Sequence, residues 1–140
     1  MEDYEIKLEE NEKRNELFIN KFESWLNEKG LVKKTIKKHL NNIELFLNNY
    51  LVYSDISTME EGVDDIDMFL GDWFIRKCMW SSKNSIKETA SSIKKFYQCM
   101  SEYSYISKED YKSVCETLKD NIEDYLESMD DYDNGNYYYF

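Results

Sequence analysis

The chain contains no proline and only four glycines among its 140 residues. Proline is the strongest helix breaker and glycine the next, so their scarcity removes the usual interruptions of helices. The remaining composition is rich in Lys, Glu, Asn, Leu and Ile. We therefore predict an all-α fold, and the length fits one domain.

Cysteine and histidine are also scarce, which excludes the common metal sites. Three cysteines (Cys78, Cys99 and Cys115) are widely spaced, no C-x-x-C occurs, and the single histidine, His39, is distant from them in sequence. A zinc site needs about four such ligands at close spacing. We expect no metal or other cofactor, and reduced thiols that pack as small hydrophobes in a cytoplasmic protein.

Long apolar runs and enzyme motifs are absent as well. No stretch approaches the roughly 18 apolar residues of a membrane span, and the acidic first residues argue against a signal peptide. The sequence has no nucleophile–base pair, phosphate-binding loop or glycine-rich fingerprint. Helix capping explains paired carboxylates such as Asp64–Asp65. We expect no membrane contact, no small-molecule substrate and no enzymatic activity.

Positive charge is limited and concentrated. The net charge is −11, yet residues 31–50 hold four lysines against one glutamate, and residues 81–106 hold four lysines against two glutamates. Whole-chain acidity argues against tight nonspecific binding to nucleic acid. A local basic patch still attracts phosphate, because charges act strongly only within a Debye length of roughly 8–10 Å.

These two basic segments are also a repeat, offset by 50 positions. Both copies begin with lysines and hydroxyl or amide side chains and continue as an amphipathic helix. The match resumes at Tyr53 and Tyr103. The identical pairs are Lys33/Lys83, Ile36/Ile86, Lys37/Lys87, Ile43/Ile93 and Phe46/Phe96.

Hydrophobic periodicity predicts helical hairpins, a further helix and a tail. The first hairpin pairs residues 5–28 with 33–50, and its charged start (residues 1–16) is expected to be a solvated extension. The second pairs a helix at residues 64–78, in which Gly71 allows close helix approach, with a fourth helix. Ser82 or Ser85 caps that helix, and Ser85–Glu88 matches a capping box. A fifth amphipathic helix covers residues 107–129, and residues 130–140 form a mobile acidic and aromatic tail.

One segment of the first half runs from Phe22–Glu23–Ser24–Trp25–Leu26 through Gly30–Leu31 and Lys34–Thr35–Ile36 to Phe46. It resembles the N-terminal core-binding domain of tyrosine recombinases, the phage integrases. The second half, from Asp65–Ile66 to Phe96–Tyr97, is similar, and the resemblance covers about residues 17–106. Val32 departs from the serine that the family usually has there. The resemblance implies a SAM-like bundle of two crossed hairpins that grips duplex DNA, and thus a link to DNA recombination and integration.

The resemblance also implies which residues meet DNA and which chemistry is lacking. The arginines, H-x-x-R pair and nucleophilic tyrosine of the catalytic domain have no counterpart here, so we expect a noncatalytic module. The contacts would come from the starts of the second and fourth helices. The implied DNA-contacting residues are Lys33, Lys34, Thr35, Lys37, Lys38, Ser82, Lys83, Asn84, Ser85 and Lys87.

Three alternatives stay open at this stage. The basic helix starts are equally explained as solvated faces. The helix at residues 107–129 either completes the core or presents an apolar face for self-association or a protein partner, and the second case makes the chain an interaction module that has lost DNA binding. The acidic tail competes for the basic patch if it reaches it. His39, Trp25, Trp73 and Trp80 are predicted to be packing residues at the core or its edge.

Overall fold

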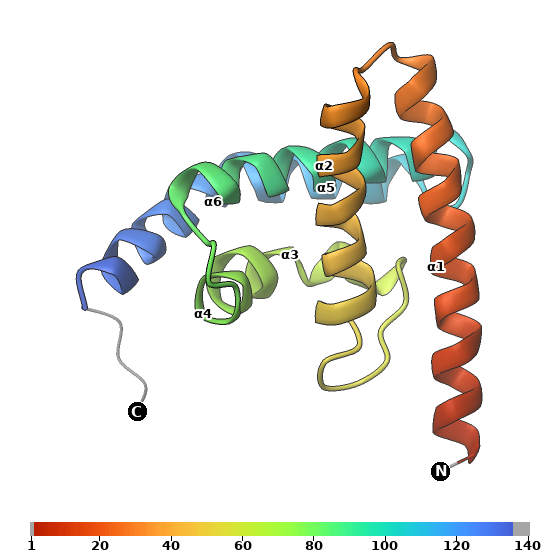
Figure 1. Cartoon of the computed structure of the whole chain (residues 1–140), viewed down its shortest axis with the longest axis horizontal. Coiled ribbons are helices and arrows are strands. Elements are labelled where there is room, and N and C mark those ends of the chain that lie inside the picture. Colours follow the sequence, from red (N-terminus) through yellow and green to blue (C-terminus); the bar gives the residue numbers. More distant parts are fainter. Residues whose placement is uncertain (1, 136–140) are drawn as a thin grey trace.

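A computed structural model describes residues 2–135, with the backbone alone for Glu2. All regular structure within this range is helical, which confirms the predicted all-α bundle (Figure 1). None of its helices combines the length and apolar character needed to cross a bilayer. The segments in chain order are α1 (Glu2–Glu28), α2 (Lys33–Leu45), η1 (Phe46–Tyr50), η2 (Glu61–Asp64), α3 (Ile66–Met68), η3 (Phe69–Trp73), α4 (Phe74–Lys77), α5 (Lys83–Glu102) and α6 (Lys108–Asp133).

A glycine cap separates α1 from α2. Gly30 has φ +81°, a left-handed conformation that side chains other than glycine rarely adopt. Its N–H donates to the carbonyl of Asn27 at 3.0 Å, and the Leu31 N–H donates to that of Leu26 at 3.3 Å. This pair of hydrogen bonds is a Schellman motif, and it turns the chain so that α1 and α2 pack as the predicted first hairpin.

The predicted helix at residues 33–50 is present, but its last turn is wider than an α-helix. η1 is a π-helical turn, in which the Leu51 N–H donates to the carbonyl of Phe46 at 3.0 Å. A second π-helical turn, η3, interrupts the predicted helix at residues 64–78. Gly71 lies in η3, and a Cβ there would stand 3.2 Å from Cδ1 of Tyr125. The predicted close approach at Gly71 is thus confirmed, and the neighbouring helix is α6.

The second half pairs its helices differently from the expectation. α5 and α6 form an extensive antiparallel hairpin, while α3 and η3 pack against α6 and not closely against α5. The physical reason is the apolar stripe of α6, which faces inward and covers both neighbours. The α1–α2 hairpin stands across α5 (Figure 1), so two hairpins still cross around one core.

The helix at residues 107–129 therefore completes the core, which resolves one of the open alternatives. The side chains that α6 buries are Val114, Leu118, Tyr125, Leu126 and Met129. The prediction that residues 130–140 form a tail without structure is wrong for its first part, because α6 continues to Asp133. Residues 136–140 lie outside the described residues.

Serine side chains cap the two long C-terminal helices. Ser82 Oγ accepts from the Ser85 N–H at 3.0 Å, and Ser85 Oγ accepts from the Ser82 N–H at 2.8 Å. The predicted capping box of Ser85 with Glu88 is therefore wrong: the box begins three residues earlier, where Ser82 has the extended conformation that a cap requires. Ser107 caps α6, with its hydroxyl accepting from the Asp110 N–H at 3.0 Å.

The apolar residues of the repeat belong to the core. Its apolar pairs, Ile36/Ile86, Ile43/Ile93 and Phe46/Phe96, are all buried. Both copies therefore present the same stripe to one shared core. Core packing alone accounts for the apolar residues of the repeat, so only its polar residues bear on function.

Two expectations about the periphery need correction. Trp80 is 62% exposed, although one edge of its ring contacts Phe74 at a centroid distance of 6.5 Å. It lies in the turn between α4 and α5, outside any helical stripe, so periodicity carried no information about it. The charged start of α1 is not wholly solvated: Asn15 is buried and its Nδ2 donates to Asn48 Oδ1 at 2.9 Å, and Arg14 forms an ion pair with Glu60 at 2.6 Å.

Candidate nucleic-acid interface

The start of α2 has no side-chain cap and no acidic residue in its first turn. Val32 occupies the N-cap position, and its apolar side chain leaves the first N–H groups of the helix without a side-chain acceptor. The first helical hydrogen bond runs from Ile36 N–H to the Val32 carbonyl at 3.0 Å. Free N–H groups and the helix dipole together make such a terminus attractive to anions.

Four lysines surround this uncapped start. Lys33, Lys34, Lys37 and Lys38 are all exposed, and Thr35 is half-buried among them. Within residues 2–135, none of the four lysines takes part in an ion pair. In a protein with net charge −11, this is an unneutralised patch of positive charge.

The start of α5, the second copy of the repeat, is already occupied by partners. Its hydroxyls cap each other, as described above. Lys83 Nζ lies 2.6 Å from Asp130 Oδ2 of α6, and Asn84 Nδ2 donates to Glu88 Oε1 at 3.3 Å. Of the five residues predicted here, only Lys87 is exposed and outside any ion pair or hydrogen bond among the described residues.

The start of α2 and the start of α5 are separated along α5, because the two helices cross in the middle of α5. His39 Nδ1 and Ser92 Oγ share a hydrogen bond of 2.7 Å, and Asn42 Nδ2 donates to the same oxygen at 3.0 Å. α2 therefore crosses α5 near Ser92, one to two turns beyond Lys87. A shallow hollow at the crossing is lined by Thr35 and Lys38 from α2 and by Ser91 from α5.

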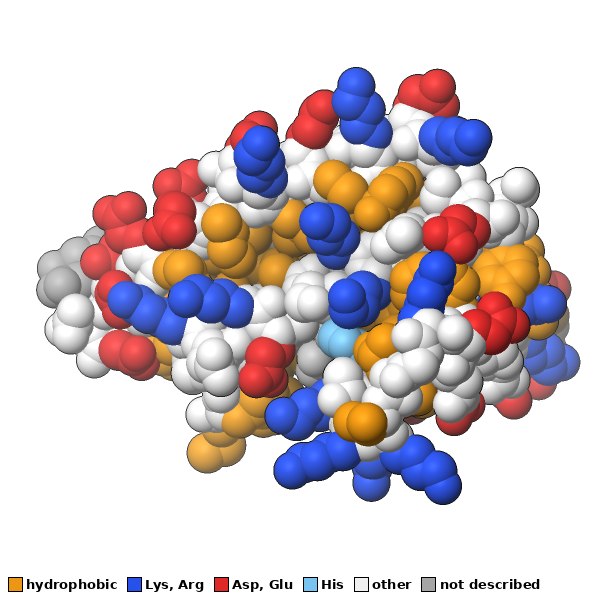
Figure 2. Space-filling view, turned by 90° about the horizontal axis from the view of Figure 1, so that it is seen from above, with side chains coloured by type: hydrophobic (Ala, Val, Ile, Leu, Met, Phe, Trp, Pro, Cys, Tyr) orange, Lys and Arg blue, Asp and Glu red, His pale blue; other side chains and the backbone are white. Residues whose placement is uncertain are grey.

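Between α2 and α6, α5 exposes a row of polar side chains, the ridge of α5, of which only Lys87 was predicted from the sequence. Lys87, Ser91 and Lys94 follow one another at helical spacing and line a second shallow hollow, together with Lys119 of α6. Figure 2 looks onto the molecule from above the α1–α2 loop and shows Lys and Arg side chains spread over this face, most densely at its lower edge. The spacing of Lys87 and Lys94 was visible in the sequence, whereas Lys119 joins them only through the packing of α6.

His39 is a packing residue, as predicted. It is buried at the crossing of α2 and α5. Burial lowers the pKa of its imidazole from the usual 6.5, Lys95 lowers it further, and Glu88 partly opposes both. The ring is therefore neutral at pH 7 and contributes no charge to the basic patch.

The cysteines behave as small hydrophobes. All three are free thiols, and Cys78 and Cys99 are buried. Burial raises the pKa of Cys78 to about 11 and that of Cys99 to about 12, so both thiols stay protonated and unreactive at neutral pH. No group of three or more potential metal ligands is found among the described residues.

Comparisons of the chain with protein-family models, with curated proteins and with solved structures gave no match. The resemblance to the core-binding domain of tyrosine recombinases thus rests on the sequence motifs alone.

Proposed function

We propose that this protein is a noncatalytic DNA-binding module that contacts the phosphate backbone of duplex DNA through the start of α2. The observation that carries the proposal is the uncapped terminus of α2 with four exposed lysines outside any ion pair in the described chain. Lysine, threonine and free backbone N–H groups are typical phosphate partners. The resemblance to integrase core-binding domains points to the same helix.

The second copy of the repeat contributes less in this proposal. Lys87 and Lys94, on the ridge of α5, extend the patch toward α6, whereas Lys83 is neutralised by Asp130. The patch contains lysines and no arginine, and lysine acts as a point charge without the planar fork that reads guanine. We therefore expect binding with little sequence preference, and DNA recombination enters only as the process that the resemblance suggests.

The number of phosphate contacts predicts how strongly the affinity for DNA depends on salt concentration. About four phosphate contacts give a slope of about −3.6 in a plot of log affinity against log salt concentration. Raising the salt from 50 to 200 mM should then weaken binding roughly 100-fold. Because this slope outweighs the long-range repulsion from the acidic rest of the molecule, which is least screened at low salt, measurable affinity is expected mainly at low salt.

The test is fluorescence anisotropy of a labelled duplex of roughly 25 base pairs at these two salt concentrations. Lys34→Glu with Lys37→Glu should abolish binding while the circular dichroism spectrum stays unchanged. Lys108→Glu with Lys112→Glu is the matched control, because both lysines are exposed and lie at the start of α6, beyond the far end of α5. Absence of wild-type binding at low salt, or equal losses in both double variants, would overturn the proposal.

The second candidate function is a protein-interaction module, and one observation favours it. Met79 is 100% exposed and Trp80 is 62% exposed, side by side in the turn before α5. Exposed methionine and tryptophan are more typical of interfaces than of ordinary protein surfaces. If the duplex does not bind at low salt, this pair becomes the first surface to test for a protein partner.

A further inference from the structure

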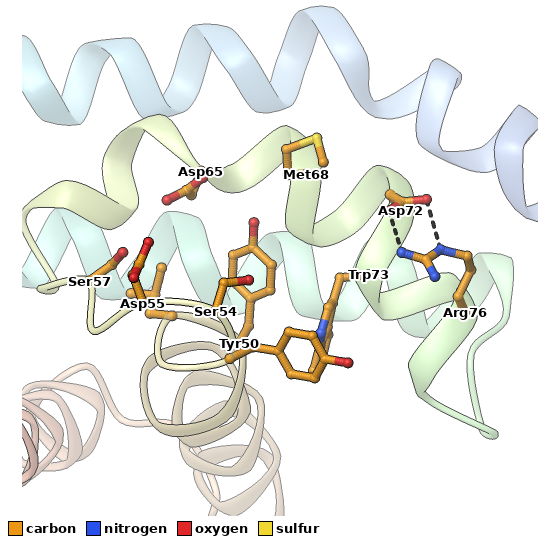
Figure 3. A pocket seen from close by; sticks show the side chains of 11 residues that line it. Tyr50, Ser54, Asp55, Ser57, Asp65, Met68, Asp72, Trp73 and Arg76 are labelled. Carbon is orange, nitrogen blue, oxygen red and sulfur yellow. Dashed lines mark hydrogen bonds and ion pairs between the residues drawn. The ribbon is translucent and has the colours of Figure 1, made fainter. Parts of the chain in front are cut away.

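A hollow of about 350 Å³ lies between the loop that follows η1 and the helical stretch from α3 to α4 (Figure 3). It is far from the basic patch: Tyr50, on its wall, follows Lys33 by 17 residues, or about 25 Å along a helix. Its volume falls in the range of small-ligand sites. Its chemistry is also opposite to that of the patch, so it calls for a different ligand.

Aromatic rings form one wall of the hollow. The rings of Tyr50 and Trp73 meet edge to face with centroids 5.5 Å apart, and those of Tyr53 and Trp73 do so at 5.9 Å. Tyr53 is 58% exposed, and Lys77 Nζ lies 5.2 Å from the centroid of its ring. This wall therefore already attracts one ammonium group, as the negative face of an aromatic ring does.

Carboxylates dominate the charge of the same hollow. Asp55, Asp65 and Asp72 line it, against one guanidinium, that of Arg76. Arg76 is held by Asp72 through two hydrogen bonds of 3.0 and 2.7 Å (Figure 3). Asp55 and Asp65 are left to give the hollow a net negative charge, and Figure 3 shows both on the side away from Arg76.

The behaviour of Tyr50 supports this reading of the local charge. Burial is the largest cause that raises the pKa of its hydroxyl to about 12, and the charges of Asp65 and Asp72 raise it further. The closeness of the Tyr50 hydroxyl to the Asp65 carboxylate acts in the same direction. An anion would meet repulsion here, whereas a cation would be stabilised.

One buried donor in the wall lacks a partner. Nε1 of Trp73 is buried and has no hydrogen-bond acceptor within the described part of the protein. Leaving such a donor buried and unpaired is unfavourable, and nearly all buried donors in proteins are paired. A ligand that brings a carbonyl oxygen next to its cation would supply the acceptor.

We propose that this hollow binds an alkylammonium group, with the ammonium facing Asp55 and Asp65 and the methylene chain lying on the rings of Tyr53 and Trp73. A free polyamine and the lysine side chain of a peptide carry the same group. The site is independent of the basic patch, so the proposal stands or falls separately from DNA binding.

The test is a titration of the ¹⁵N-labelled full chain, followed through the indole N–H signals of its three tryptophans. The probes are spermidine and a short end-capped peptide whose only charged group is a central lysine, and the control is sodium chloride at equal ionic strength. Trp73→Phe identifies the signal of Trp73 by its loss. We expect that signal to shift saturably at submillimolar to millimolar concentrations, while the signal of Trp25, whose N–H donates to Glu102 at 2.9 Å, stays in place.

Asp55→Asn with Asp65→Asn should weaken this binding at least tenfold, because it removes charge without changing volume. Asp3→Asn with Asp120→Asn is the matched control for net charge, since both aspartates are exposed and outside the hollow. If Asp65→Asn disturbs folding, the exposed Asp55→Asn alone should still weaken binding. Tighter binding of the peptide than of spermidine identifies a protein ligand, and the reverse identifies a polyamine. No saturable shift with either probe, or equal affinity in the two double variants, would overturn the proposal.

Discussion

Lys83 at the start of α5 and Asp130 near the end of α6 form an ion pair, with Nζ 2.6 Å from Oδ2. Both side chains are about half exposed, at 50% and 49%. The pair makes the two copies of the repeat unequal, because Lys33, the counterpart of Lys83, has no such partner among residues 2–135. Asp130, which belongs to α6, thus pairs with one of the two basic helix starts, while competition between the acidic tail and DNA stays a prediction.

Asp130→Asn should therefore raise the affinity for duplex DNA about two- to tenfold at low salt, because it frees Lys83 for one more phosphate contact. Stability should change by less than about 1 kcal/mol, since exposed ion pairs contribute little. Anisotropy titrations and urea unfolding measure the two quantities. Asp120→Asn removes the same charge from an exposed position on α6, and an equal gain in that variant would show that net charge alone is responsible.

Val32→Asp should stabilise the protein and weaken DNA binding at the same time. Val32 is 68% exposed and has φ −74° and ψ 153°, the extended conformation of an N-cap. An aspartate there would accept from the free N–H groups and stabilise α2 by about 0.5–1 kcal/mol. Its charge would repel the phosphate that the proposal places at this terminus.

Val32→Asn separates the two effects, because it caps the helix without adding charge. Unfolding experiments should find both variants more stable than the wild type. Duplex binding should fall clearly more for Asp than for Asn. Unchanged binding of Val32→Asp would mean that no phosphate sits at the start of α2.

His39 should titrate below its usual pKa of 6.5, because burial and Lys95 both disfavour its charged form. The unfolded chain then binds a proton more readily than the native one between pH 6.5 and the lowered native pKa. The contribution of His39 to stability is thus fully present above pH 6.5 and is lost as the pH falls through this window.

Proton NMR measures this pKa directly, since the chain has a single histidine. Lys95→Gln should raise the pKa by removing a nearby positive charge, while Lys112→Gln, on α6, should leave it unchanged. A native pKa at or above 6.5 would contradict the burial of the ring between α2 and α5.

The helices were largely predictable from the sequence, because their signals are local. The absence of proline, the glycine at position 30 and the spacing of apolar residues placed α1, α2 and α5 within a few residues of their observed bounds. The π-helical turns η1 and η3 were not predicted, because short apolar stretches indicate a helix without distinguishing its i→i−4 from its i→i−5 hydrogen bonds. α6 extends beyond its predicted end because Met129 is buried and Asp130 pairs with Lys83, both of which are tertiary contacts.

The polar residues of the candidate site could be named from the sequence, but which of them form ion pairs within the protein could not. The sequence placed Lys33 and Lys83 in equivalent roles, and only the packing of α6 shows that Asp130 neutralises the second. The aromatic and acidic hollow could not be foreseen at all. It joins Tyr50, Asp55, Asp65 and Trp73 from segments whose relative position depends on the loop after η1.

Gly62→Ala should destabilise the protein by about 1–3 kcal/mol, the usual cost of overpacking a core. Gly62 is buried, and a Cβ there would stand 2.7 Å from Tyr97 Oη, 2.9 Å from Leu51 Cδ1 and 3.1 Å from Phe46 Cζ. Tyr97 cannot move aside freely, because its hydroxyl donates to the Met59 carbonyl at 2.7 Å. Urea unfolding followed by circular dichroism measures the loss.

The double variant Gly62→Ala with Tyr97→Phe tests this cause. Tyr97→Phe alone should be destabilising, because it removes the buried hydrogen bond to the Met59 carbonyl, which keeps only the longer one from the Gly62 N–H at 3.2 Å. It also removes the hydroxyl oxygen that stands nearest to the new methyl group. If that clash is the main cost, the two changes together should cost clearly less than the sum of the single changes. Strict additivity would instead place the strain at Leu51 and Phe46, whose side chains remain in the double variant.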